Sequence, residues 1–209
     1  WVRSGHSGFR VLTGIPRAAR WPELGADRVR GVIEAARAWV DLLVVDTAAA
    51  IEADELLMSD VSAPQRNAAA LTALRAADHV IAIAAADPVG LARYLRGHAE
   101  LLESASPRRV TTVVNKVRSS VVGLNPSGQV AQTLARFGGI SDPVLVPWDP
   151  ASFDAALLGA RPLRDAAPRA PARLAIRDLV RERLLPPETG PARRRRRANV
   201  RSAAASLDG

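Results

Sequence analysis

The sequence has no cysteine and a single lysine, and each scarcity excludes a kind of site. Without cysteine there are no disulfide bonds and no thiolate metal ligands, which agrees with a reducing compartment. The three histidines, His6, His79 and His98, do not have the spacing of metal ligands. The one lysine, Lys116, has no glycine before it, so the chain contains no GK[ST] loop of the kind that binds phosphate groups.

Long apolar runs are also missing, and the excess positive charge is confined to one end of the chain. No run approaches the ~20 apolar residues that a membrane-spanning helix needs, and the start WVRSGHSGFR has no signal-peptide core. We therefore expect a cytoplasmic protein, and the first residue, Trp1, indicates a piece of a longer chain. The net charge is +8, but residues 1–168 are nearly balanced and the arginine excess follows them. Residues 186–209 have neither periodicity nor core residues, and we expect a disordered basic tail there.

The remaining residues alternate between short apolar runs and longer alanine-rich segments of helical periodicity. Residues 87–104 begin with Asp87-Pro88, which is a favourable helix start, and residues 109–115 are rich in β-branched side chains. The pattern predicts strands at 9–14, 41–46, 79–85, 109–115 and 143–149, and helices at 26–39, 63–77, 87–104, 126–139, 149–159 and 170–185.

This alternation predicts an α/β domain over residues 1–185. Continuous apolar strands separated by helices are typical of a three-layer fold, a mostly parallel sheet covered by helices on both faces. Ligands of such sheets bind at the carboxyl ends of the strands. The residues at these ends are therefore the first candidates for a functional site.

The stretch DLLVVDT carries the first candidate, Asp46. Four apolar residues run directly into this carboxylate, as in the Walker B strand of a nucleotide-binding protein, where it holds a water of a bound Mg²⁺. Thr47 adds a hydroxyl. The alternative is that Asp46 simply ends a buried strand and caps the next turn.

Two further strand ends carry residues that suit the recognition of a base. Asn115 offers a donor and an acceptor, which match an adenine edge, although a loop Asn also commonly bonds to local backbone. In VPWDP, backbone groups beside Pro147 could contact the other side of the base. The alternative there is a plain turn in which Asp149 caps the next helix.

Read together, residues 9–180 resemble the C-terminal two-thirds of the MinD/ParA family of P-loop ATPases, especially its CpaE-like and actinobacterial septum-site or partitioning members. The matching pieces are DLLVVDT, LTALRAADHVIAIAAADPVGLARYLR, VVNKVR and VPWDPASFDAALLGARPLRDAAPRAPARLAIRDL. The last is the most specific, because the family follows its final strand with a P-x-D-P … A-x-x-x-G-x-P-L run. The resemblance implies a P-loop NTPase-like fold, truncated at its N-terminus.

The resemblance also implies a function for the intact protein. It would be an ATP- and Mg²⁺-dependent homodimer that switches its protein partners with nucleotide turnover and positions a division site, a chromosome or a pilus or secretion apparatus. Asp46 would be the Walker B carboxylate and metal residue, Asn115 an adenine contact and Pro147 a wall of the base pocket. The neighbouring site residues would be Thr47, Lys116, Trp148 and Asp149.

The sequence departs from the family in two ways. Many members have a glycine-containing switch after the Walker B aspartate, whereas this chain has Ala48-Ala49-Ala50. The GK[ST] loop is absent, so we expect the phosphate-binding loop to lie upstream, and this chain alone to be inactive. A non-hydrolysing scaffold of the same fold is the alternative.

The C-terminal region raises a separate possibility of contact with DNA or membrane. Helix 170–185 is amphipathic, which would suit an anionic membrane surface, but we expect its apolar face to pack on the sheet. The arginine cluster of the tail could bind DNA or anionic lipid, which would place the protein at the membrane periphery. Its members are Arg193, Arg194, Arg195, Arg196 and Arg197.

Overall fold

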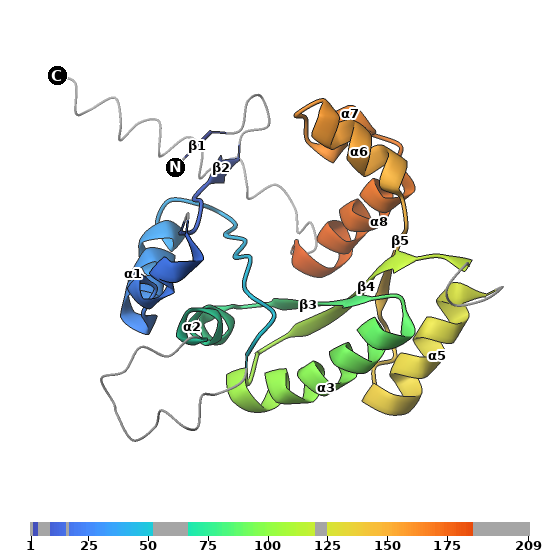
Figure 1. The fold of residues 1–209 in the computed structure, drawn as a ribbon, viewed down its shortest axis with the longest axis horizontal. Helices are drawn as coiled ribbons and strands as arrows, with labels where there is room; N and C mark the ends of the chain where they lie inside the picture. Colours follow the sequence, from blue (N-terminus) through green and yellow to red (C-terminus); the bar gives the residue numbers. More distant parts are fainter. Residues whose placement is uncertain (1, 4–8, 16, 52–66, 120–124, 186–209) are drawn as a thin grey trace, which may run out of the picture. The chain divides into compact units, whose positions relative to one another are not determined.

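The computed structural model describes residues 2–3, 9–15, 17–51, 67–119 and 125–185. The chain divides into two compact units, Trp1–Pro143 and Val144–Gly209 (Figure 1). The elements of the first unit are β1 (Val2–Arg3), β2 (Arg10–Val11), the 3-10 helix η2 (Ala18–Glu23), α1 (Ala26–Arg37), α2 (Ala68–Ala76), β3 (Val80–Ala85), α3 (Pro88–Ala105), β4 (Val110–Val117) and α5 (Pro126–Gly138). Those of the second are β5 (Val144–Pro147), α6 (Pro150–Leu158), α7 (Leu163–Ala166), α8 (Pro171–Leu179) and the π-helix η4 (Val180–Leu184).

The centre of the first unit is a parallel pair of strands. β3 and β4 run in register from Val80 opposite Val110 to Ala85 opposite Asn115. β4 is rich in valine and threonine, whose branched side chains pack well on a pleated surface. Its residues 111–114 are all buried, so this strand is the most enclosed element of the unit.

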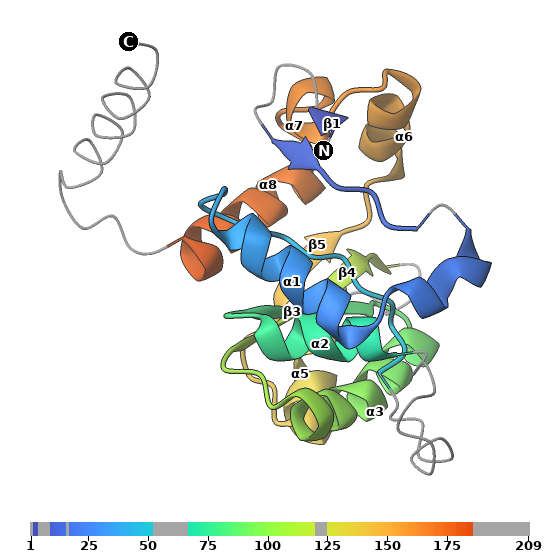
Figure 2. The ribbon, with the colours of Figure 1, turned by 90° about the vertical axis from the view of Figure 1, so that its left-hand side faces the viewer.

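The helices of the first unit pack around this pair. α3 contacts β3 and α5, and Figures 1 and 2 show α3 and α5 on the same side of β3 and β4. Val80 lies in a buried cluster with Leu101 and Ala105 of α3, and with Leu71 of α2. Ile51 also belongs to this cluster, so the chain that leaves α1 is anchored in the core before α2 begins.

Short sequence signals set where two of these helices begin and end. The Asp87 side chain accepts a hydrogen bond from the Gly90 N–H at 2.8 Å, and Pro88 takes the first helical position of α3. Asn125 caps α5 in the same way, through the Gly128 N–H. α5 ends at Gly138, and its C-cap Gly139 has a φ of 65°, the left-handed conformation that glycine adopts without strain.

The second unit is a strand followed by helices. α8 packs against β5, with Ala172 and Leu179 of α8 buried. The helix therefore packs on β5 as expected, although Ile176 of its predicted apolar face is exposed. In place of one helix over 170–185, α8 ends at Leu179 and the chain continues as η4.

Most predicted elements are present, but two predicted strands are not. Segment 41–46, which we expected to be a buried strand, has no strand assignment, and five of its six residues are exposed. The strand expected at 9–14 is reduced to the two residues of β2, which pair antiparallel with β1. The predicted tail at 186–209, including its arginine cluster, lies outside the described residues. Within the described part of the chain, no helix is both long and apolar enough to cross a membrane.

A small polar cluster joins α3 to β4. The Tyr94 hydroxyl lies 2.7 Å from Thr112 Oγ1 and 3.5 Å from His98 Nδ1, and the Tyr94 and His98 rings stack with their centroids 5.5 Å apart. Burial lowers the pKa of His98 below its usual 6.5, because the charged imidazolium is desolvated. The folded protein therefore prefers His98 neutral.

This preference predicts a pH-dependent stability. Between pH 6.5 and the lower pKa of folded His98, the unfolded chain binds more protons, so the free energy of unfolding falls as the pH falls through this window. We expect His98→Gln to lose less of its urea midpoint than the wild type between pH 7.5 and pH 5.5. The other two histidines are present in both proteins, so their titration affects both urea midpoints equally. An equal fall of the midpoint in both proteins would contradict the lowered pKa of His98.

Candidate functional site

The carboxyl ends of β3 and β4 lie together at one edge of the sheet. Ala85 is the register partner of Asn115, and the Ala86 N–H donates to the Asn115 carbonyl at 2.9 Å. The next residue, Asp87, starts α3. This helix approaches the strand end closely, because a Cβ on Gly90 would meet the Ala85 Cβ and carbonyl oxygen at 2.7 Å. The sheet and the first turn of α3 therefore form one rigid edge.

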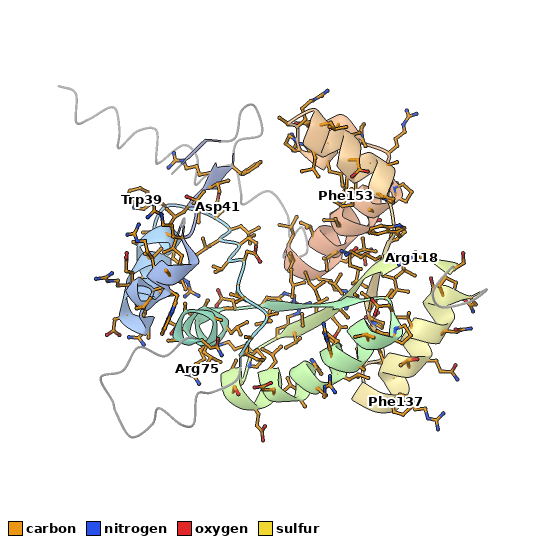
Figure 3. The ribbon with its side chains drawn as sticks, viewed as in Figure 1. Trp39, Asp41, Arg75, Arg118, Phe137 and Phe153 are labelled. Carbon is orange, nitrogen blue, oxygen red and sulfur yellow. The ribbon has the colours of Figure 1, made fainter. Side chains whose placement is uncertain are left out.

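Asn115 occupies this edge, as predicted, and its side chain has a local partner. Its Oδ1 accepts a hydrogen bond from the backbone N–H of Lys116 at 2.8 Å. Lys116 has a φ of 64°, an unfavourable conformation for a residue with a Cβ. The Asn115 amide thus supports a strained turn at the end of β4. Lys116 itself is exposed, and Arg118, labelled in Figure 3, follows it near the end of the strand.

Asp46 and Thr47 lie in the segment between α1 and the buried Ile51. Asp46 is exposed and Thr47 half-buried, and Figure 3 labels Asp41 at the start of the same segment. The prediction of a buried strand that presents Asp46 is wrong for this structure. The physical reason is that a strand forms by pairing its backbone, and among the described residues no strand pairs with 41–46.

The second unit holds Pro147, Trp148 and Asp149. Pro147 ends β5, and Asp149 is the N-cap of α6: its Oδ1 accepts from the Ser152 N–H at 3.4 Å and its carbonyl from the Phe153 N–H at 3.4 Å. This is the capping role that the sequence offered as the alternative. The other carboxylate oxygen, Oδ2, is buried and has no hydrogen-bond partner. Trp148 is 45 % exposed.

The seven candidate residues divide between the two units. Asp46, Thr47, Asn115 and Lys116 belong to the first unit, and the other three to the second. The described residues contain no group of three or more His, Cys, Asp or Glu side chains that could hold a metal ion. For a nucleotide-bound Mg²⁺ ion these residues offer the exposed carboxylate of Asp46, and the chain has no lysine-bearing phosphate loop, so they could supply only part of such a site.

Sequence reasoning missed a groove between α1 and α2. Its volume is about 350 Å³, and it is lined by Ala26, Arg30, Ile33, Glu34, Arg37, Thr72, Arg75 and Ala76. The arginines are held by the protein: Arg30 pairs with Asp27 at 2.8 Å, Arg37 with Asp78 at 3.2 Å, and Arg75 donates to the Ser104 carbonyl. Arg37 therefore links α1 to the segment that precedes β3, and Arg75 links α2 to α3, whereas the Arg30 pair lies within α1. No sequence motif marks this groove.

Comparison with known proteins supports the fold. The structure is similar to the crystal structure of a ParA family ATPase from Chlorobium tepidum TLS, with a TM-score of 0.56 and 16 % sequence identity. The fold is ParA-like. It is the predicted P-loop NTPase-like α/β class, with a mostly parallel sheet and helices around it.

The structural similarity covers only part of the ParA family ATPase. It covers 80 % of this chain but only 61 % of the other, so the chain spans less than two thirds of the ParA family structure. No protein-family model matches the sequence, and no curated protein matches it. At 16 % identity the likeness shows the fold alone.

The structural role found for Asn115 can be measured. Asn115→Ala removes the acceptor of the Lys116 N–H, and we expect the free energy of unfolding to fall by about 0.5–1.5 kcal/mol. Asn115→Asp keeps an oxygen at the same place and is the matched control. Urea denaturation of the three proteins gives the values, and equal losses in both variants would show that this hydrogen bond does not matter.

Proposed function

We propose that this chain is the C-terminal part of a MinD/ParA/CpaE-like ATPase that binds and hydrolyses ATP and acts as a nucleotide-switched positioning factor. The observation that carries the proposal is the likeness to a ParA family ATPase over 80 % of the chain. The quoted motifs DLLVVDT, VVNKVR and VPWDP occur in the order that this family would require. The intact protein would act as a homodimer on a division site, a chromosome or a secretion or pilus apparatus.

The strand ends support a nucleotide site that this chain supplies only in part. Asn115 lies at the carboxyl end of β4, where parallel sheets bind ligands, and would contact the adenine. Pro147 and Asp149 lie at the corresponding end of β5. Asp46 would hold a Mg²⁺-bound water. The phosphate-binding loop would come from sequence outside residues 1–209, since Lys116 is the only lysine.

The division of the site predicts that the 209-residue chain binds ATP weakly or not at all. Phosphate loops supply most contacts to the charged part of a nucleotide, through backbone N–H groups and a lysine. We expect titration calorimetry with ATP and Mg²⁺ to give no dissociation constant tighter than about 1 mM. Micromolar affinity would refute the assignment of the phosphate contacts to another segment.

The intact gene product offers the direct test of ATPase function. If the coding sequence before Trp1 supplies a GK[ST] loop, the full protein should hydrolyse ATP. Asp46→Asn should then weaken the apparent affinity for Mg²⁺, measured as the Mg²⁺ concentration that gives half-maximal hydrolysis, by roughly 10–100-fold. This is the usual effect of removing a group that holds a metal-bound water.

Asp41→Asn is the matched control, because Asp41 is exposed and flanks the same four apolar residues. It should leave hydrolysis unchanged. Equal effects of both substitutions, or a complete reading frame without a phosphate loop, would overturn the proposal.

A non-hydrolysing scaffold of the same fold is the second candidate. The exposed position of Asp46, followed by three alanines, favours it, because such a segment neither presents a fixed carboxylate nor offers a glycine for close approach to a phosphate. Partner binding that persists without nucleotide would distinguish this candidate from the ATPase. Contacts of Arg193–Arg197 with DNA or anionic membrane remain a proposal under either function.

A further inference from the structure

The groove between α1 and α2 combines apolar and basic lining residues. The two helices pack side by side (Figure 1). Ile33 is the buried apolar residue of the groove, and Ala26 and Ala76 are half-buried beside it. The charged lining residues are Arg30, Glu34, Arg37 and Arg75. Three positive charges against one negative charge give the groove a net positive lining, which favours an anionic partner.

The two arginines on α1 can exchange their present partners for those of another molecule. Arg30 pairs with Asp27 and Arg37 with Asp78, and the side chains of these aspartates are 94 % and 78 % exposed. Ion pairs in such exposed positions contribute little to stability, because water solvates both charges nearly as well when they are apart. A carboxylate that arrives in the groove therefore replaces Asp27 or Asp78 at small cost.

The third arginine, on α2, is held in place by the protein. Nε and Nη2 of Arg75, which Figure 3 labels, donate to the Ser104 carbonyl at 3.1 and 2.9 Å. Among the described residues Arg75 makes no ion pair, so the rest of its guanidinium can donate to an incoming carboxylate. An arginine that is already held in one orientation loses less side-chain entropy when it binds.

The spacing of the charges indicates the shape of the partner. Arg30 and Arg37 are two turns apart on α1, which is roughly 10 Å along the helix axis. Arg75 belongs to the Arg37 end of the groove, because Arg37 donates to the carbonyl of Ala76. Glu34 lies between the two α1 arginines, about one turn from each, and repels a negative charge placed midway. The groove therefore fits two carboxylates about 10 Å apart with an uncharged, apolar group between them.

We propose that the groove between α1 and α2 is a docking site for an acidic amphipathic helix of a partner protein. Carboxylates at positions i and i+7 of that helix have the required spacing, and apolar side chains at i+3 and i+4 lie on the same face between them. One carboxylate pairs with Arg30 and the other with Arg37 and Arg75, while the apolar side chains contact Ile33. This is the helix-in-groove mode of recognition, made specific by charge.

The charge pattern favours such a partner over a second copy of this chain. Among the described helices only α1 has two carboxylates seven residues apart, Asp27 and Glu34, and the face between them carries Arg30 and Gly31 in place of apolar side chains. A second copy therefore lacks the apolar part of the match. The inference rests on charge and spacing in the first unit and does not depend on nucleotide binding.

A designed peptide tests the charge pattern by NMR titration of the 209-residue chain. The probe is the capped peptide AQEAQLLQAEQA, which has its two glutamates at i and i+7 and two leucines between them. At low salt it should shift the amide signals of α1 and α2 with a dissociation constant of roughly 0.1–1 mM. The control peptide AQQAQLLQAQQA keeps the leucines and has no carboxylates, and it should bind at least roughly tenfold more weakly.

Substitutions in the protein should change the affinity for the acidic peptide in opposite directions. Arg30→Gln removes one end of the charge pattern and should weaken binding by roughly threefold or more, whereas Glu34→Gln removes the repulsive charge and should tighten it by a similar factor. Arg28→Gln is the matched control, because Arg28 is exposed on the same helix but does not line the groove. It should leave the affinity nearly unchanged.

Several results would overturn the proposal. Equal binding of the two peptides, or equal affinities of the Arg30→Gln and Glu34→Gln variants, would show that the charge pattern does not select a partner. Free glutamate that produces the same shifts at the same concentration would assign the groove to small anions. Dimers in sedimentation that the acidic peptide dissociates would assign it to a second copy.

Discussion

The hydrogen-bonded pairing of β3 with β4 is the constraint on which the rest of the first unit depends. Buried backbone groups must be paired, and the β4 strand satisfies them on one side of β3. The register that sets Ala85 opposite Asn115 also fixes where both strands end. It therefore determines where α3 starts and where the Asn115 side chain emerges. A slip by one residue would turn each side chain to the other face and remove both features.

Features decided by a few neighbouring residues could be predicted from the sequence. α3, α5 and α6 all begin with an Asp or Asn followed by proline, and in each the side chain accepts a hydrogen bond from the third residue after it. Proline presets the helical φ and needs no donor at that position. These signals act within one turn, so no distant contact can overrule them easily. The strands β3, β4 and β5 were likewise predicted to within a few residues.

Features that need a distant partner could not be predicted in the same way. The run LLVV before Asp46 has the composition of a buried strand, but its backbone must find a neighbour before it becomes one, and composition says nothing of that neighbour. The strand predicted at 9–14 shortened to β2 for the same reason, since only two residues of β1 pair with it. Nor could the sequence choose between the two roles of Asn115, because the local hydrogen bond depends on the left-handed turn at Lys116.

The local bond of Asn115 and its proposed contact with a base are compatible. An Asn side chain has two acceptor positions on its oxygen and two donors on its nitrogen, and the Lys116 N–H uses one of the four. A fixed amide is also a better reader of a base edge than a mobile one, because less side-chain entropy is lost on binding. Asp46 differs, since nothing in the described chain fixes the backbone that carries it. The same backbone constraint that orders the β4 end therefore separates the two candidates: Asn115 lies on a paired strand, which gives its amide a defined position, whereas segment 41–46, which carries Asp46, has no strand pairing among the described residues.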